Sequence, residues 1–236
     1  MIKRRREKVS IIIPTYQEGR YIGNLLSHLT NIDHPAEIII VDGGSTDKTI
    51  EVAKRFTDNI YQIKERGISK AKNYGAKNAN GDILIFLDAD VELPPDFINR
   101  VLDAFKDRRV VGATCNIMPS RPRPSERAFF LFYNLLLRFC SLFKPHSRGE
   151  FIAIRREVFM KIGGFNESLS CLEDHDLAMR ASKIGKFIFI NNLTIYETLR
   201  RIRKLGLLNV VRTWMINYIF FIIRGKPLAE IWKAVR

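Results

Sequence analysis

Hydrophobic and polar positions follow two different periods along the first half of the chain. Short runs rich in apolar, mostly β-branched residues predict strands at 9–13, 37–41, 59–63, 82–87 and 110–114. Apolar residues spaced three and four apart, together with helix-start signals, predict helices at 22–29, 45–53, 69–78 and 96–105. Strands that alternate with helices need crossover connections, which produce a parallel sheet. The pattern therefore predicts an α/β fold.

Polar side chains gather where three of these strands end. In parallel α/β sheets, ligands bind beyond the carboxyl ends of the strands. This rule selects three segments that are rich in acidic or small polar residues, namely 14–18, 42–47 and 88–90. The sequence thus predicts a ligand site at this edge of the sheet.

Asp88 and Asp90 directly follow one of the most apolar strands. Alternate positions on extended backbone point two carboxylates the same way, and like charges at close range repel. A hard divalent cation relieves that repulsion and fills its other sites with water and phosphate oxygens. An isolated Asp-x-Asp is a common pattern, but its position after a buried strand favours a metal site.

Several short motifs occur in an order that is specific in combination. They are Pro14-Thr-Tyr-Gln-Glu18, Val41-Asp-Gly-Gly-Ser-Thr-Asp47, Gly67-Ile-Ser-Lys-Ala-Lys-Asn73, Asp88-Ala-Asp90, Gly163-Gly-Phe-Asn-Glu167 and Glu173-Asp174. Over about residues 9–180 the chain resembles the family 2 glycosyltransferases. The resemblance implies the GT-A fold, a Rossmann-like three-layer sandwich around a mostly parallel sheet. It also implies inversion at the anomeric carbon, a divalent metal (Mn²⁺ or Mg²⁺) and a nucleotide-diphosphate sugar donor, with a UDP-sugar expected before a GDP-sugar.

The resemblance assigns residues to the nucleoside pocket. It implies that the pocket is lined by Pro14, Thr15, Tyr16 and Glu18. Asp42 would accept a hydrogen bond from the base. Asp47 lies in the same loop, where a ligand contact and a helix-capping role suit its carboxylate equally.

The resemblance also assigns the diphosphate and metal contacts. Lys70 and Asn73 match positions near the diphosphate and ribose, and a lysine point charge suits a diphosphate. Asp88 would face the ribose and the metal, Ala89 would lie beside it in the donor site, and Asp90 would ligate the metal directly.

A second carboxylate cluster, Glu173-Asp174-His175-Asp176, precedes an apolar helical run. The resemblance implies that Asp174 is the general base for the acceptor hydroxyl, with Glu173 as its orienter or as a contact to the acceptor. An inverting displacement needs a base, because a neutral hydroxyl is a weak nucleophile. The alternative, for Asp176 and to a smaller degree for Asp174, is that the carboxylate only complements the helix dipole. His146 and His175 suit packing roles better than a third metal ligand or a diphosphate contact.

Two further segments, 128–143 and 207–223, are apolar but shorter than the roughly 20 residues that span a bilayer. Both are flanked by Lys and Arg, which favours amphipathic helices lying on anionic lipid. In the second segment one face is polar, with Asn209, Arg212, Thr213 and Asn217. The opposite face carries Leu207, Val211, Trp214, Tyr218 and Phe221. Packing on the core, packing on a twin subunit in a homodimer, and a transmembrane hairpin are the alternatives.

The composition indicates which partners and which cellular compartment to expect. Lys and Arg number 39 against 25 Asp and Glu, which favours anionic partners. Because no nucleic-acid-binding motif is present, we expect no nucleic acid partner. Three widely spaced cysteines and no evident secretion signal favour the cytoplasm, at the inner face of the cell membrane.

We expect a GT-A catalytic domain over residues 1–200, with a nucleotide-sugar half at about 9–115 and an acceptor half at about 116–200. Residues 201–236 should form an amphipathic helical segment. Without the Gln-x-x-Arg-Trp motif and several spans of processive synthases, we expect one sugar per encounter, transferred to a hydroxyl of a glycan or lipid-linked acceptor. The alternatives are a polyprenyl-phosphate sugar synthase, whose phosphate acceptor needs no base, and a non-enzymatic basic membrane-binding module.

Overall fold

The computed structural model describes residues 7–32 and 34–228. Its strands are β1 (Val9–Thr15), β2 (Ala36–Asp42), β3 (Ile60–Gln62), β4 (Ile83–Leu87), β5 (Val91–Glu92), β6 (Val110–Pro119), β7 (Phe151–Arg155) and β8 (Lys186–Glu197). Its helices are α1 (Ile22–Thr30), α2 (Thr49–Ala53), α3 (Ile68–Lys77), α4 (Phe97–Ala104), α5 (Pro124–Ser141), α6 (Arg156–Lys161), α7 (Glu173–Ala181), α8 (Arg200–Leu205) and α9 (Leu207–Arg224).

One sheet holds the eight strands of the described residues, in the order β3-β2-β1-β4-β7-β6-β8-β5. Parallel pairs join β1 to β2 and β4, β2 to β3, and β6 to β8. β7 runs antiparallel between β4 and β6, and β5 runs antiparallel to β8. The predicted α/β fold with a mostly parallel sheet is confirmed, and β7 adds an antiparallel strand at its centre.

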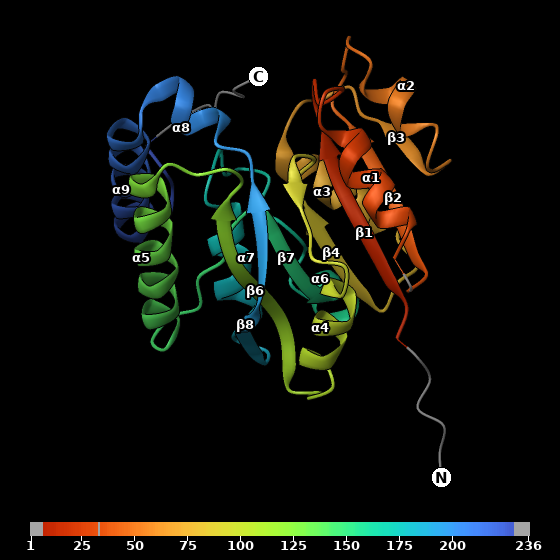
Figure 1. The fold of residues 1–236 in the computed structure, drawn as a ribbon. Coiled ribbons are helices and arrows are strands. Elements are labelled where there is room, and N and C mark those ends of the chain that lie inside the picture. Colours follow the sequence, from red (N-terminus) through yellow and green to blue (C-terminus); the bar gives the residue numbers. More distant parts are fainter. Residues whose placement is uncertain (1–6, 33, 229–236) are drawn as a thin grey trace.

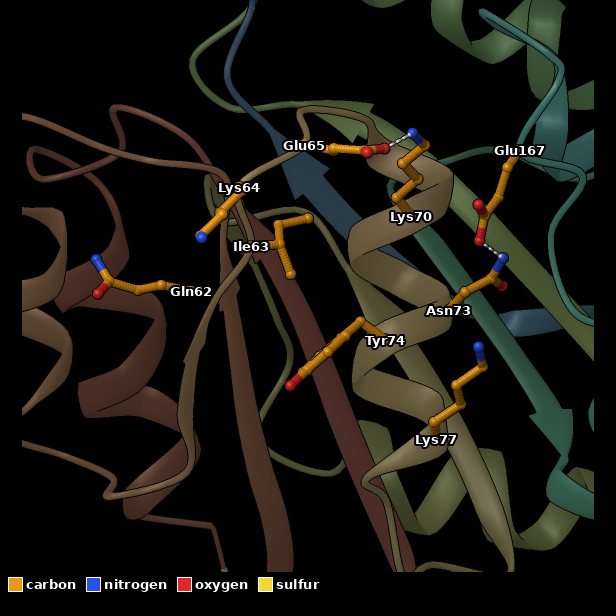
Figure 2. Close-up of a pocket in the computed structure, with 9 residues that line it drawn as sticks. All are labelled: Gln62, Ile63, Lys64, Glu65, Lys70, Asn73, Tyr74, Lys77 and Glu167. Atoms are coloured by element: carbon orange, nitrogen blue, oxygen red, sulfur yellow. Dashed lines mark hydrogen bonds and ion pairs between the residues drawn. The ribbon is translucent and has the colours of Figure 1, made fainter.

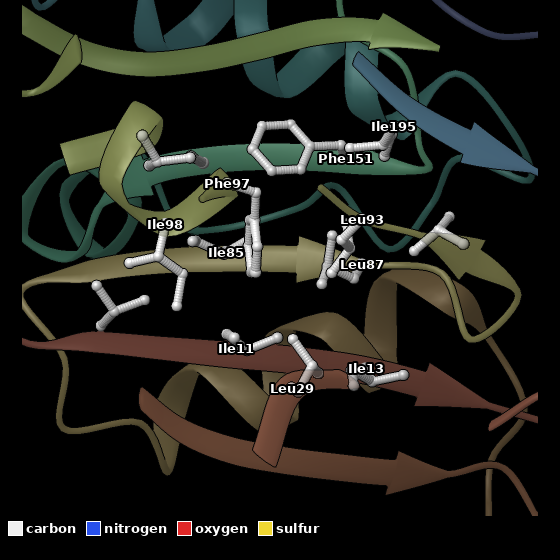
Figure 3. Packing of buried hydrophobic residues seen from close by; sticks show 14 of the residues in the cluster. Ile11, Ile13, Leu29, Ile85, Leu87, Leu93, Phe97, Ile98, Phe151 and Ile195 are labelled. Carbon is white, nitrogen blue, oxygen red and sulfur yellow. The ribbon is translucent and has the colours of Figure 1, made fainter. Parts of the chain in front are cut away.

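Alternate residues of the central strands enter two hydrophobic clusters, one on each face of the sheet. Ile11 and Ile85 pack with α1 and α4 on one face (Figure 3), whereas Ile12 packs with α3, α6 and α7 on the other. Figure 1 shows the resulting three layers. A Cβ at Gly75 of α3 would lie 2.5 Å from Ile12 Cγ2, so glycine permits the close approach of that helix to β1.

The helices α5 and α9 lie side by side, outside the β6–β8 half of the sheet (Figure 1). Tyr133 and Trp214 stack between them with ring centroids 5.8 Å apart. Asn134 of α5 bonds to both backbone groups of Ile117 on β6, donating to its oxygen at 2.8 Å and accepting from its nitrogen at 3.2 Å. Because β7 pairs with β6 only further back, at residues 112 and 113, this amide takes the place of a strand partner.

Three local features differ from the sequence prediction. Helix α2 begins at Thr49 rather than 45, because the amides of Gly44 and Ser45 bond to the Asp42 carboxylate and those of Thr46 and Asp47 to the side chain of Gln17. Residues 151–155 and 186–197 form strands that the pattern did not predict. The placement of Asn217 on the polar face of α9 was wrong: it is only 4% exposed, and its side chain donates to the oxygen of Thr213 one turn earlier. Residues 229–236 of the predicted C-terminal segment lie outside the described residues.

Candidate active site

The loops that follow β1 and β2 are joined by side-chain hydrogen bonds. Thr15 Oγ1 donates to Asp42 Oδ2 at 3.0 Å, and Asp42 Oδ1 accepts from the amides of Gly44 and Ser45 at 2.9 and 2.8 Å. The amide of Gln17 donates to Ser45 Oγ at 2.8 Å. Asp42 is fully buried, and its hydrogen bonds fix the shape of these two loops. Its contact with a base stays a prediction.

Asp47 links the same two loops. Its carboxylate accepts from the amide of Gly19 at 3.0 Å and from the amide of Thr49, the first residue of α2, at 3.0 Å. Burial acts to raise the pKa of Asp47, but hydrogen bonds, that of the Thr49 hydroxyl first, lower it. Asp47 therefore bonds to the first amide of α2 from the position before its N-cap, Lys48, and a ligand contact of Asp47 stays a prediction.

The other residues assigned to the nucleoside pocket lie at the end of β1. Pro14 pairs with Val41 near the ends of the two strands. The guanidinium of Arg66 lies 4.4 Å from the ring centroid of Tyr16. Gln17, between Tyr16 and Glu18 in the sequence, has a φ of 58°, an uncommon conformation for a residue other than glycine. Such backbone strain gathers at functional sites.

Glu18 and Asp90 share one cation, Arg200 at the start of α8. Arg200 donates to the two carboxylate oxygens of Glu18 at 3.0 and 3.2 Å and lies 2.8 Å from Asp90 Oδ2. Its guanidinium also lies 4.5 Å from the ring centroid of Tyr21, and Thr198 donates to Asp90. The turn after β4 is thereby tied to the loop after β1.

Asp88 begins the turn between β4 and β5, followed by the buried Ala89. Burial raises the pKa of Asp88 to about 8; Lys72 opposes the shift, and Glu150 and Asp90 add to it. Burial is thus the main reason that the acid form of Asp88 is favoured, and the charge of Lys72 offsets only part of its effect.

Glu173 and Asp174 open α7, directly after Leu172, which has a left-handed φ of 64°. Lys72 Nζ lies 3.3 Å from Glu173 Oε1, and the side chain of Lys72 is 0% exposed. His175 Nδ1 lies 3.2 Å from Asp174 Oδ1. Burial acts to raise the pKa of Asp174, but the charge of His175 lowers it. Burial also raises the pKa of Glu173. Asp174 is therefore held as a carboxylate beside a cation.

Lys70 and Asn73 lie on a separate pocket along α3, shown in Figure 2. Lys70 pairs with Glu65, and Asn73 donates to the Phe165 oxygen and to Glu167 at 2.9 and 2.8 Å. This pocket of about 390 Å³ is lined by Gln62, Ile63, Lys64, Glu65, Lys70, Asn73, Tyr74, Lys77 and Glu167. Asp88 and Asp90 do not line it. The structure thus links Glu18 to Asp90 through Arg200, and Asp88 to Asp174 through Lys72. Lys70 and Asn73 line the separate pocket along α3.

Two cations of this region, Lys72 and Arg200, were absent from the sequence prediction. A signal for Lys72 exists, since it shares a helical face with Ser69 and Ala76, which both lie against the core. Arg200 follows β8, a strand that the pattern did not predict, and its partner Asp90 is 110 positions away.

The residues at the end of β4 fit a divalent metal. Among residues 7–32 and 34–228, no three His, Cys, Asp or Glu side chains form a group that could hold a metal ion. Mg²⁺ needs only one or two protein carboxylates when phosphate and water complete its shell. The pKa of Asp88, raised by burial and by neighbouring acids, indicates a site where a further cation would be stabilising.

Comparison with known proteins places the chain in a family. The model described as Glycosyl transferase family 2 matches residues 10–163. A dolichol-phosphate mannosyltransferase from Pyrococcus furiosus is 37% identical over 107 residues, which cover 42% of this chain and 30% of that protein.

Solved structures share the fold. Mannosyltransferase PcManGT from Pyrobaculum calidifontis, in complex with GDP-Man and Mn²⁺, has a TM-score of 0.71 and 25% identity, covering 90% of this chain and 65% of that one. TarS from S. aureus, in complex with UDP-GlcNAc, has a TM-score of 0.64 and 21% identity, covering 81% and 58%. The chain therefore spans between 30% and 65% of the length of these three proteins. Because the family model matches residues 10–163, most of the chain, and the solved structures share its fold, the chain belongs to glycosyl transferase family 2.

Proposed function

We propose that this glycosyltransferase moves one sugar per encounter, with inversion, from a UDP- or GDP-sugar to a hydroxyl of a glycan or lipid-linked acceptor. Asp88 and Asp90 hold Mn²⁺ or Mg²⁺, and Asp174 is the general base. Pro14, Thr15, Tyr16 and Glu18 line the nucleoside pocket on the loop that Asp42 shapes. Lys70 and Asn73 lie toward the diphosphate and ribose, and the small Ala89 leaves room beside them.

The observation that carries the proposal is the position of Lys72 between two acid clusters. Its ammonium group lies 3.3 Å from Glu173, and the charges of Glu173, Asp88 and Asp174 raise the pKa of Lys72 against the effect of burial. Asp88 on the donor side and Asp174 on the acceptor side thus act on one buried cation. A displacement needs this arrangement, because the leaving group and the nucleophile act at the same carbon.

Asp174 suits the role of base, since His175 keeps it ionised. As the acceptor oxygen bonds to the anomeric carbon, its proton passes to the Asp174 carboxylate, and the bond from that carbon to the diphosphate breaks. A divalent cation, when bound, would neutralise charge on the departing diphosphate. Glu173, paired with Lys72, fixes the start of α7 beside this carboxylate.

Asp174→Asn tests the base. We expect transfer to a hydroxyl acceptor, or hydrolysis of the donor by water, to fall by about 10²- to 10⁴-fold, because general-base catalysis is worth that much. The matched control is Asp176→Asn on the same helix, whose carboxylate pairs with Arg180 at 2.6 Å. It should stay near the wild-type rate.

Donor binding separates loss of the base from loss of the site. UDP-GlcNAc or GDP-mannose with Mn²⁺, at a hundredfold excess over Kd, should add about 2.7 kcal/mol to the unfolding free energy of both wild type and Asp174→Asn. The melting temperatures of the two proteins should therefore rise equally. A wild-type hydrolysis rate in Asp174→Asn would refute the base assignment.

A polyprenyl-phosphate sugar synthase is the second candidate, supported by the 37% identity to a dolichol-phosphate mannosyltransferase over part of the chain. A phosphate acceptor is already ionised and needs no base. In that case Asp174→Asn would transfer to a polyprenyl phosphate at the wild-type rate. Family membership favours either enzyme over a non-enzymatic membrane module.

We further propose that the protein works at the cytoplasmic face of a membrane, through α5 and α9. Large apolar side chains are exposed on both helices and just beyond α5: Leu131, Phe132, Leu135, Leu136, Phe139, Leu142, Phe143, Leu208, Met215, Ile216, Ile219, Ile222 and Ile223. Exposed basic residues surround them, among them Arg127, Lys144, Arg212, Arg224 and Lys226. This combination suits anionic lipid better than a second copy of this basic chain.

Helix α9 also meets the length and composition of a membrane span. It is the one such helix among the described residues, with a mean hydropathy of 1.3 and 17% of its residues buried. Its inner side, with Trp214 and Tyr218, packs on the protein, so we propose that α9 lies along the membrane surface rather than across it. Sedimentation with lipid vesicles tests the contact.

A further inference from the structure

Helix α9 sends one tyrosine back toward α7. Tyr218 Oη lies 2.7 Å from His146 Nε2, and the Tyr218 ring centroid is 5.7 Å from those of both His146 and His175. The two imidazoles meet edge to face with centroids 5.4 Å apart. These three rings form one cluster that joins α9, the segment after α5 and the first turn of α7.

The hydrogen bonds of His146 define its protonation. Its Nδ1 lies 2.7 Å from the carbonyl oxygen of Lys144, and because a carbonyl only accepts, Nδ1 carries the proton. Burial, and then the charge of His175, lower the pKa of His146, so the ring is neutral and its Nε2 accepts from the Tyr218 hydroxyl. Lys144 and Tyr218 therefore hold the ring from both sides.

His175 is the more basic of the two imidazoles. Burial acts to lower the pKa of His175, but Asp174 raises it. The rings of Tyr218 and His146 meet the His175 imidazole edge to face and so enclose it beside Asp174. The titratable and charged groups around it are Glu173 and Asp174 on α7, Arg148 before β7, and His146, with Lys72 of α3 facing the same acids.

We propose that Tyr218 is a positioning residue for Asp174. Through its hydrogen bond to His146 and its packing on His175, it holds the cationic partner of the base, so sugar transfer depends on α9 being seated on the catalytic domain. The inference rests on the proposed role of Asp174. If α9 lies on a membrane as proposed, that contact would then directly affect the rate of sugar transfer.

Nitrogen NMR of the imidazole rings in the whole chain tests the contact without any acceptor. Tyr218→Phe removes the hydroxyl and keeps the ring, Tyr218→Leu removes both, and Tyr61→Phe on β3 is the matched control. The chain has four histidines, and His175→Gln assigns the His175 signal. We expect the His175 titration midpoint to shift by about 0.5 pH unit in Tyr218→Leu, which changes both the burial of the imidazole and its seat beside Asp174, and by less in Tyr218→Phe. Wild-type midpoints in both Tyr218 variants would overturn the proposal.

Hydrolysis of UDP-GlcNAc or GDP-mannose with Mn²⁺, measured against pH, gives the second readout. In the Tyr218 variants the acidic limb of kcat should move to higher pH, because Asp174 loses part of its cationic partner, while the donor KM and the melting temperature of Tyr218→Phe stay the same. If Asp174→Asn is inactive while the Tyr218 variants behave as wild type, the proposed function still holds, but Tyr218 does not position Asp174. A fully active Asp174→Asn removes both.

Discussion

Arg200 holds two acids from distant parts of the chain. Its side chain is 18% exposed, and the side chains of Glu18 and Asp90 are 5% and 12% exposed. Breaking such a pair strands buried charge, so Arg200→Ala should lower the unfolding free energy by about 3 kcal/mol in EDTA. Because Mn²⁺ can supply charge at Asp90, the stabilisation by Mn²⁺ should be larger in Arg200→Ala than in wild type. Urea unfolding with EDTA and with Mn²⁺ measures both effects.

An exposed arginine provides the control for Arg200. Arg109 pairs with Asp107 at 2.9 Å, but its side chain is 73% exposed, so Arg109→Ala should leave the stability and the Mn²⁺ response unchanged. An Mn²⁺ response of Arg200→Ala equal to that of wild type would contradict the placement of the metal at Asp90.

At the scale of single residues, acids were easier to predict from the sequence than the cations that pair with them. Asp88 and Asp90 stand out because they follow a buried strand, and Asp174 belongs to a motif that carries the family resemblance; the roles of all three stay predictions. Arg200 has no such motif, and its contacts with Asp90 and Glu18 span 110 and 182 positions. Only the folded chain brings them together.

Helix α7 begins with an ion pair whose strength depends on pH. The pKa of His175 is raised, so its contribution to stability is present below about 6.5 and is lost as the pH rises through the folded value. The pKa of Asp174 is lowered, so its contribution is present above about 3.9 and is lost as the pH falls through the folded value. The pair therefore stabilises the fold most between about pH 4 and 6.5.

Urea unfolding between pH 5.5 and 9 measures this dependence. Wild type should lose stability across that range in a way that His175→Gln does not, because the variant has no imidazolium to lose. His28→Gln, in the last turn of α1, should retain the wild-type slope. Equal slopes in wild type and His175→Gln would contradict the ion pair.

At the scale of elements, the predictable ones were those with a strong local period. β1, β2, β4 and the helices between them follow directly from apolar spacing. β7 and β8 complete the sheet by pairing with β4, β5 and β6, so their partners lie far away in the sequence. Asn217 was misplaced for a related reason: its amide donates to the helix backbone at Thr213, which lets a polar side chain lie inside.

At the scale of the whole molecule, the exposed apolar face of α5 and α9 predicts lipid binding. Phe139→Glu with Ile223→Glu places charge on that face and should reduce binding to vesicles containing phosphatidylglycerol by about tenfold or more. Vesicles of phosphatidylcholine alone, or added salt, should weaken binding of wild type, because the basic residues around the face would lose their partner.

The matched change lies elsewhere on the surface. Met160 of α6 is also an exposed apolar residue, so Met160→Glu controls for added charge. If the double variant and Met160→Glu bind vesicles as wild type does, the face serves another partner, and a second copy of the chain becomes the first to test by sedimentation.

The amide of Asn134 has a consequence for solubility. Where β7 diverges from β6, backbone groups of β6 would be open to a strand from another molecule, and open edges are templates for aggregation. By bonding to both the nitrogen and the oxygen of Ile117, Asn134 closes that edge with a side chain. The same helix whose outer face we propose to bind lipid thus covers this edge of the sheet against strands of neighbouring molecules.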